Sequence, residues 1–260
     1  MAGRDDAVML NQRSESVIRL FTRAAPTYGS VGPPHFTYFA RRLVDFVGVA
    51  AGDRVLDVAT GTAAARRTAE RAGRSVQLVG IDLTPAMLQR GRREAGQRGV
   101  AARLCMMDAE RLAFGANSFD LVLCSFAFLS ISDKQRALLE FRRVLAPGAR
   151  VGVPDAFGWF FEHDSRWEWQ TELLASHGVL GNHRTAENGS LLETMLRDAG
   201  YASVQVRDDA FELVFRDADE WWRWVWSHGS RGLFEAVPRN RRRELKTALY
   251  RGLAACVEED

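Results

Sequence analysis

The chain has 260 residues, 47% of them hydrophobic and 26% charged, a composition typical of a globular protein large enough to bury a full core. Its formal net charge of +2 implies no strongly basic surface, so a nucleic-acid partner is not expected. Cys105, Cys124 and Cys256 lack C-x-x-C spacing, so neither a metal site nor a disulfide framework is supported, and a reducing cytoplasmic location is expected.

Residues 1–52 are predicted to form an N-terminal helical cover. A polar tail leads into an amphipathic helix that ends near residue 25, and a breaker-rich loop at 24–34 precedes a second helix at 35–47. The tail lacks the apolar stretch of a signal peptide. No uncharged run approaches the ~20 apolar residues that a transmembrane helix needs, so no membrane span is expected.

Residues 53–155 are predicted to form an α/β core. Short apolar runs alternate with helical segments, which indicates right-handed βαβ units and a Rossmann-like, doubly wound, mostly parallel sheet. The expected strands cover residues 54–59, 76–82, 101–108 and 149–155, and residues 119–129 are a strand that runs into an apolar loop. The expected helices cover residues 63–72, 85–97 and 133–145, the last with Asp133 as its N-cap.

Residues 156–260 are predicted to add helices that cover a substrate and to complete the sheet. A helix at 190–199 should end at Gly200, and the sequence from residue 217 is helical. Segments 204–208 and 211–215 have strand character. Either 211–215 supplies the last strand of the sheet, or that strand is missing and leaves an open edge that needs cover.

Acidic residues stand at the ends of three successive expected strands. Asp57 precedes the small-residue turn ATGTA, Asp82 follows 25 residues later, and Asp108 ends the third strand. Each acid alone has a simpler explanation, as part of a tight turn or a helix cap. Together they would meet at the carboxyl edge of a parallel sheet, where such folds bind ligands. Asp82 can accept both hydroxyls of an adenosine ribose, and Asp108 the exocyclic amine of adenine.

Five segments carry a family resemblance over residues 17–155: VLDVATGTA, GIDLTPAML, MMDAERLAF, FDLVLCSFAF and RVLAPGARVGV. With them the chain resembles a class I S-adenosylmethionine-dependent methyltransferase, close to the ubiquinone/menaquinone-type small-molecule branch. The resemblance implies S-adenosylmethionine (SAM) as cofactor. It also implies the binding residues: Asp57, Ala59, Thr60 and Gly61 at the methionine end, Asp82 at the ribose, Leu83, Met87, Asp108 and Ala109 at the adenine, Ser125 beneath the sulfonium, and Tyr28 closing over the cofactor.

One departure from the family pattern lies in the first turn, where Ala63 replaces the third glycine. A methyl group there should tighten the contact between helix and strand, and cofactor binding is still expected.

The candidate general bases are His228 and His163, ahead of His177, His183 and Asp155. Histidine is the usual proton acceptor near neutral pH, although a structural role explains any single histidine equally well. The seven tryptophans all follow the core, and the run at 221–226 is too dense for one helical stripe. These rings either pack the C-terminal helices together or form an apolar lid over a substrate.

The expected function is therefore transfer of a methyl group from SAM to oxygen, nitrogen or carbon of a small hydrophobic or aromatic substrate, such as a bacterial secondary metabolite. One alternative keeps SAM as a scaffold for another reaction, such as a cyclisation. An NAD-dependent oxidoreductase is disfavoured because the chain lacks G-x-G-x-x-G spacing and a Tyr-x-x-x-Lys pair. The oligomeric state stays open, with a homodimer among the options.

Overall fold

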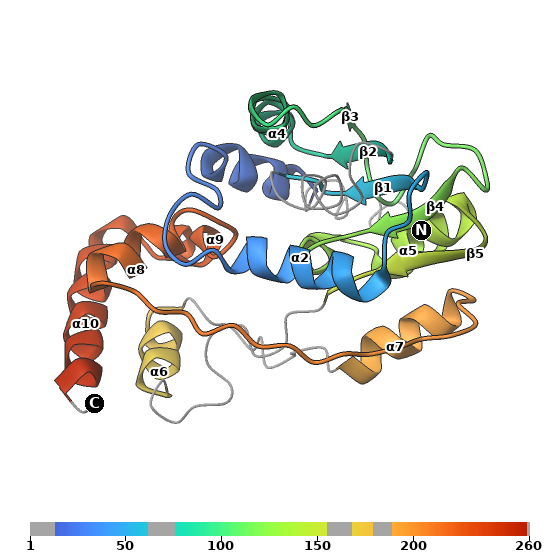
Figure 1. Cartoon of the computed structure of the whole chain (residues 1–260). Helices are drawn as coiled ribbons and strands as arrows, with labels where there is room; N and C mark the ends of the chain where they lie inside the picture. Colours follow the sequence, from blue (N-terminus) through green and yellow to red (C-terminus); the bar gives the residue numbers. More distant parts are fainter. Residues whose placement is uncertain (1–13, 62–75, 155–167, 179–188, 259–260) are drawn as a thin grey trace, which may run out of the picture.

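The computed structural model describes residues 14–61, 76–154, 168–178 and 189–258. Its centre is a five-stranded parallel sheet in the order β3-β2-β1-β4-β5 (Figure 1). The strand order reverses between β1 and β4, which makes the sheet doubly wound and confirms the predicted α/β class. The strands are β1 (Arg54–Val58), β2 (Gln77–Asp82), β3 (Ala102–Met106), β4 (Phe119–Leu123) and β5 (Leu145–Gly152).

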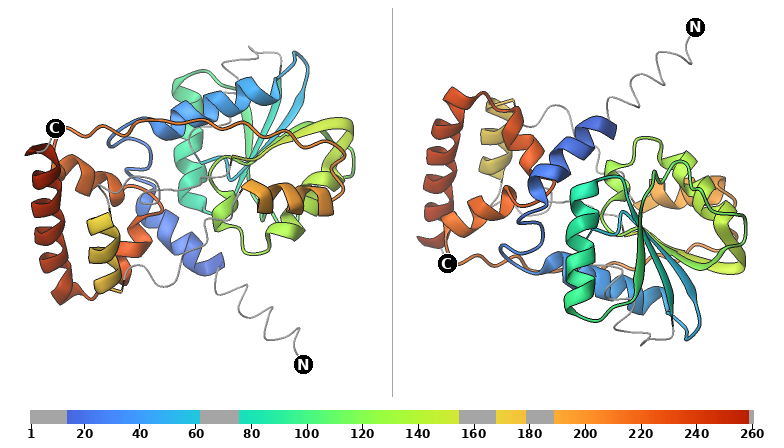
Figure 2. Two further views of the ribbon diagram at one scale, coloured as in Figure 1. Left: turned by 90° about the horizontal axis from the view of Figure 1, so that it is seen from below. Right: turned by 90° about the horizontal axis from the view of Figure 1, so that it is seen from above.

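Helices cover both faces of the sheet (Figure 2). On one face, Leu43 and Val44 of α2 (His35–Val47) pack against apolar side chains of β1, β2 and β4. On the other face, α5 (Lys134–Val144) and α7 (Gly189–Asp198) enclose the larger core cluster. Burial of these apolar stripes, rather than helix propensity, fixes the layered arrangement.

Two helices begin where the sequence predicts. The helix α4 (Pro85–Gln97) starts with proline at its first position, where the missing N–H has no intrahelical partner to lose. At α5, the Asp133 side chain accepts a hydrogen bond from Arg136 N at 2.9 Å and caps the helix as predicted. The predicted helix at 63–72 lies outside the described residues.

The fifth strand begins earlier than the predicted residue 149. Leu145 already pairs with Phe119, and the next pair is Arg150 with Leu121, so the register shifts between them. Gly148 lies in this irregular stretch with φ +76. Proline and glycine at 147–148 are typical of a loop, so the sequence does not predict the part of β5 that precedes the bulge.

The predicted strands at 204–208 and 211–215 do not form. Residues 202–215 are extended but belong to no sheet, and they run along α2 (Figure 2). Asp209 accepts a hydrogen bond from Tyr38 Oη at 2.9 Å and pairs with Arg42, while the Phe211 ring lies 4.9 Å from that of Tyr38. The two-residue periodicity therefore marks an extended segment whose partner is a helix, and it does not complete the sheet.

The C-terminal helices form a hydrophobic cluster of their own beside the sheet (Figure 1). They are α6 (Glu168–Ser176), α8 (Ala218–Val225), α9 (Arg231–Ala236) and α10 (Arg239–Glu258). All four tryptophans of the 221–226 run belong to this cluster, which supports helix packing as the main role of the run. Within the described ranges, no helix combines the length and apolar character needed to cross a membrane.

A pH-dependent ion pair joins the two central strands. Arg54 of β1 donates to Asp120 of β4 through its guanidinium, at 2.8 and 2.9 Å, and through its backbone N–H at 2.9 Å. These bonds lower the pKa of Asp120 to about 2. Because the pKa of Asp120 in the folded state is below the unfolded value of about 3.9, the pair stabilises the fold at pH values above about 3.9. The contribution is lost as the pH falls from about 4 to about 2.

We therefore expect Asp120→Asn to lose less free energy of unfolding than the wild type between pH 4 and pH 2. Urea unfolding followed by circular dichroism at several pH values measures this difference. Identical pH dependence in the two proteins would show that the pair contributes no stability.

Candidate active site

The turn after β1 is tied to β2 at the carboxyl edge of the sheet. Asp57 is fully buried, and its carboxylate accepts a hydrogen bond from Thr60 Oγ1 at 2.6 Å. The Thr60 backbone N–H donates to the carbonyl of Ile81 at 2.8 Å. Asp57, the first of the three predicted acids, therefore fixes the conformation of the turn through its bond with Thr60.

The backbone of this turn adopts left-handed conformations at two residues. Ala59 has φ +51 and Gly61 has φ +45. A side chain is strained at such angles, and glycine adopts them without steric cost. A Cβ at position 61 would also lie only 3.2 Å from Met87 Cε. The small residues therefore let a ligand approach the backbone between β1 and α4.

Asp82 is the last residue of β2, at the carboxyl edge of the sheet where folds of this topology bind ligands in a crevice, and it is 8% exposed. Its carboxylate accepts hydrogen bonds from Thr84 N at 2.8 Å and from Gly61 N at 3.2 Å. Burial raises the pKa of Asp82, and these backbone bonds oppose the rise. Each carboxylate oxygen can accept more than one hydrogen bond, so Asp82 can still receive hydroxyl donors from a ligand.

The N-terminal loop lies over this end of the crevice. Arg90 of α4 donates to the Ala25 carbonyl at 2.6 Å and holds the loop down. The Tyr28 ring stacks on Phe36 at 5.1 Å with an interplanar angle of 15°. Burial raises the pKa of the Tyr28 hydroxyl well above its usual range, and the charge of Asp82 adds to the rise. The Tyr28 hydroxyl and the Asp82 carboxylate are therefore close enough to interact electrostatically.

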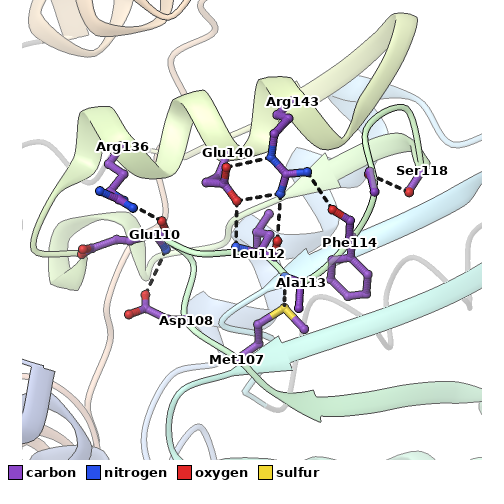
Figure 3. Close-up of polar contacts among 11 residues, drawn as sticks. Met107, Asp108, Glu110, Leu112, Ala113, Phe114, Ser118, Arg136, Glu140 and Arg143 are labelled. Atoms are coloured by element: carbon purple, nitrogen blue, oxygen red, sulfur yellow. Dashed lines mark hydrogen bonds and ion pairs between the residues drawn. The ribbon is translucent and has the colours of Figure 1, made fainter.

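The loop after β3 is fixed to α5 by a polar network (Figure 3). Asp108 accepts a hydrogen bond from Glu110 N at 2.9 Å, and the Glu110 carboxylate accepts from the backbone of Ser132 and Asp133. Further along the loop, Glu140 accepts from Leu112 N at 2.8 Å. Sequence analysis did not predict these anchors, which hold Asp108 and the neighbouring Ala109 at the edge of the sheet.

The end of β4 carries a buried hydroxyl. Ser125 Oγ has no hydrogen-bond partner among the described residues and no exposure to solvent. The next residue, Phe126, has φ +55. Burial, together with the charge of Asp57, raises the pKa of the Cys124 thiol, so the ends of β1 and β4 share this region. An unsatisfied buried hydroxyl at this point is well suited to meet a polar ligand group.

Comparison with known proteins identifies the family. A profile described as a methyltransferase domain matches residues 55–148. The chain is 30% identical over 257 residues to nocamycin O-methyltransferase from Saccharothrix syringae, covering 91% of this chain and 90% of that protein. The chain belongs to the class I SAM-dependent methyltransferases.

Shorter matches agree with this assignment. The aklanonic acid methyltransferase DauC from Streptomyces sp. strain C5 is 37% identical over 139 residues, 53% of this chain and 63% of that protein. The demethylmenaquinone methyltransferase of Thermus thermophilus is 40% identical over 113 residues, 44% of this chain and 51% of that protein. This chain therefore spans only about half to two thirds of the length of these two relatives. The crystal structure of YcgJ from Bacillus subtilis has the same fold, with a TM-score of 0.57 at 24% identity over 81% of this chain and 83% of that one.

The described residues fit SAM, the cofactor of this methyltransferase family. The turn at Ala59 and Gly61 leaves its backbone accessible, Asp82 offers carboxylate oxygens for hydroxyl donors, and Ser125 offers an unsatisfied hydroxyl. Apolar surface lies alongside, since Leu83 is partly buried and Met87 is 3% exposed.

The structure places one of the two preferred catalytic histidines. His228 is 1% exposed, and its ring centroid lies 4.5 Å from that of Trp224 and 6.1 Å from that of His35. Burial lowers the pKa of His228 to about 3. His177 packs at the end of α6, where its Nδ1 donates to the Leu173 carbonyl. His163, His183 and Asp155 lie outside the described residues.

Aromatic rings continue from the cofactor crevice toward His228. Phe36 contacts Tyr28, Phe126 and His228, with centroid distances of 5.1, 5.4 and 5.7 Å. Phe39 lies 5.6 Å from Phe126. We call the set Tyr28, Phe36, Phe39, Phe126 and Trp224 the aromatic wall. Sequence analysis missed its two phenylalanines in α2, since their role depends on α2 meeting the end of β4.

Proposed function

We propose that this methyltransferase acts on a small hydrophobic or aromatic metabolite bound against the aromatic wall. The observation that carries the proposal is the position of the wall, in which Phe36 joins Tyr28 to Phe126 at the end of β4. Phe36 also contacts His35, which in turn contacts Trp224 of α8. Aromatic faces of this kind favour flat, apolar ligands. The names of the nocamycin and aklanonic acid methyltransferases support a secondary-metabolite substrate, and the former supports an oxygen acceptor.

Within this proposal the residues of the crevice hold the cofactor. Asp82 would bind the ribose hydroxyls, Leu83, Met87, Asp108 and Ala109 the adenine, and Asp57, Ala59, Thr60 and Gly61 the methionine end, with Tyr28 and Ser125 closing the site. When bound, SAM supplies a methyl group on a positively charged sulfur, a strong electrophile. The protein's contribution is then to orient the acceptor, exclude water and receive a proton. His228, together with His163, would serve this last need.

We further propose that residues 53–155 bind the cofactor while 1–52 and 156–260 cover the substrate. The partner is then a small molecule and not a nucleic acid, consistent with the net charge of +2. Cys105 and Cys124 are free thiols, which supports work in a reducing cytoplasm. A homodimer remains part of the proposal and is tested by light scattering.

Turnover tests this function. We expect SAM and a panel of polycyclic phenols and hydroxyquinones to yield S-adenosylhomocysteine and methylated product in equal amounts by mass spectrometry. Product formed without S-adenosylhomocysteine would instead assign the cofactor a scaffold role. Asp82→Ala is the negative control, and absence of turnover with every hydroxylated aromatic compound would contradict the proposed substrate class.

A further inference from the structure

The N-terminal loop, residues 25–34, is fastened to α4 by one side chain. Arg90 Nη1 donates to the carbonyl oxygen of Ala25 at 2.6 Å, and Arg90 Nε donates to Glu94, one turn further along the same helix, at 2.8 Å. The Arg90 side chain is only 13% exposed. Glu94 therefore orients the guanidinium so that Nη1 meets the loop.

The bond acts at the end of a helix. Residues 14–24 are helical, and Ala25 N still donates to the carbonyl of Phe21 at 2.8 Å. The last carbonyls of a helix have no intrahelical partner and carry the negative end of the helix dipole. Arg90 therefore supplies, from another helix, the positively charged donor that such an end favours.

Tyr28 follows Ala25 in a compact stretch of backbone. Thr27 N donates to the Ala24 carbonyl at 3.0 Å, and Ser30 N donates to the Thr27 carbonyl at 3.1 Å. Two successive tight turns therefore contain or adjoin the tyrosine. Because these turns fix Tyr28 relative to Ala25, a displacement of Ala25 carries Tyr28 with it.

The Tyr28 hydroxyl senses both the fastening residue and the proposed ribose ligand. Burial raises the pKa of Tyr28 above its usual range, the negative charge of Asp82 adds to the rise, and the positive charge of Arg90 opposes it. The hydroxyl is therefore close enough to interact electrostatically with both side chains. The part of the loop that Arg90 holds is thus the part that reaches toward Asp82.

Beside the bond, a pocket separates the loop from α4. Gly29, Val31 and Pro33 are among its lining residues on the loop side, and Arg90 and Glu94 line it on the α4 side. Among the described residues, the bond from Arg90 is the one hydrogen bond between residues 25–34 and α4. A single polar bond beside a pocket can break without first separating a large apolar interface.

We propose that Arg90 is a positioning residue that controls the exchange of the cofactor, a role that rests on the proposed function. It holds the N-terminal loop over the crevice, so its bond to Ala25 must break before SAM enters or S-adenosylhomocysteine leaves. The bond therefore slows passage in both directions and keeps Tyr28 in place during the reaction.

The regions on either side of this stretch have anchors of their own. Before it, Arg23 Nε donates to Glu235 of α9 at 3.0 Å. After it, a Cβ on Gly32 would lie only 2.8 Å from Trp224 Cδ1, so the loop backbone packs directly on that ring. Loss of the Arg90 bond therefore frees the stretch between these two anchors and leaves the N-terminal helix attached.

The rates of cofactor exchange test this role. In stopped-flow measurements with S-adenosylhomocysteine, Arg90→Ala is expected to raise both the association and the dissociation rate constant about tenfold, through loss of one charged hydrogen bond. The dissociation constant should then change less than about threefold. Arg90→Lys keeps the charge and a donor, so both of its rate constants should lie between those of the wild type and Arg90→Ala.

A second arginine of α4 provides the matched control. Arg92 also donates to a backbone carbonyl, that of Leu104 in β3, so Arg92→Ala should leave both rate constants unchanged. Hydrogen exchange followed by mass spectrometry gives a second readout. Peptides that cover residues 24–34 should exchange faster in Arg90→Ala than in the wild type, while peptides from β4 and β5 should exchange at the same rate.

The outcomes separate gating from other roles. Faster dissociation with unchanged association, and hence weaker affinity, would show that Arg90 stabilises the bound ligand directly and would overturn the proposal. Unchanged rate constants in a folded Arg90→Ala protein would overturn it as well. If the wild type binds no S-adenosylhomocysteine, or Asp82→Ala binds it as tightly as the wild type, the proposed cofactor site itself has failed and the role of Arg90 with it.

Discussion

Asp82→Ala is expected to weaken binding of S-adenosylhomocysteine by about 100-fold or more. Hydrogen bonds to a charged group contribute about 1.5–3 kcal/mol each, and every 1.4 kcal/mol is a factor of ten in affinity. If Asp82 binds both ribose hydroxyls as proposed, these two bonds would account for about two to four factors of ten, less the desolvation of Asp82. Calorimetric titration of the wild type and the variant measures the difference.

The variant also removes the acceptor for Gly61 N and Thr84 N, so its folding must be checked. Asp82→Asn keeps the size of the side chain and separates loss of charge from loss of volume. Asp120→Ala is the matched control, because Asp120 binds Arg54 and lies at the opposite, amino-terminal end of its strand. Unchanged affinity in a folded Asp82→Ala protein would show that another group binds the ribose.

The position of the acids at this edge of the sheet was predictable because it follows from the topology of a parallel sheet. In a parallel sheet all strands end at one edge, so acids at the ends of successive strands must converge there. The sequence places Asp57, Asp82 and Asp108 at such ends, and β1, β2 and β3 are adjacent in the sheet. Local chemistry was sufficient too for α4 and α5, where Pro85 and Asp133 mark the helix starts.

What sequence reasoning could not supply depends on contacts between distant segments. The strand character of 204–208 and 211–215 indicates extended backbone, and residues 202–215 are extended, although Val206 and Val214 stay exposed. Periodicity does not say whether the apolar side meets a strand or a helix. Here Phe211 packs on Tyr38 and Phe39 of α2, so the segment covers a helix and forms no ladder.

The tryptophan run illustrates the same limit. Its density correctly indicates that the rings face more than one way. Trp221 contacts Phe234 within the C-terminal cluster, while Trp224, a buried member of the same cluster, also contacts His35 and His228. A helical wheel places positions 221 and 224 on one face of the helix but cannot say that this face also meets residues at the start of α2.

The second large effect is expected at Gly91 of α4, where the helix touches the turn that follows β1. A Cβ at this position would lie 2.7 Å from the Gly61 carbonyl oxygen and 3.4 Å from Leu104 Cδ1. The first contact is with backbone, which cannot rotate away as a side chain can. The turn that carries the Gly61 N–H bound to Asp82 would therefore have to move with it.

We expect Gly91→Ala to lower the free energy of unfolding by about 1–3 kcal/mol, the usual range for overpacking. It should also weaken S-adenosylhomocysteine binding, since the turn and Asp82 are displaced together. Gly96→Ala on the same helix is the matched control, because a Cβ there meets nothing within 4 Å. At that exposed site alanine should stabilise the helix by up to about 1 kcal/mol and leave affinity unchanged.

The comparison separates packing from helix propensity. Both variants make the same chemical change in α4, so any general effect of replacing glycine by alanine appears equally in each. In thermal unfolding, the stability of Gly91→Ala should be lower than that of the wild type and the stability of Gly96→Ala should be higher. In calorimetric titration, only Gly91→Ala should lose affinity for S-adenosylhomocysteine. If Gly91→Ala were as stable as Gly96→Ala and bound S-adenosylhomocysteine normally, α4 would not be packed against the turn as closely as 2.7 Å implies.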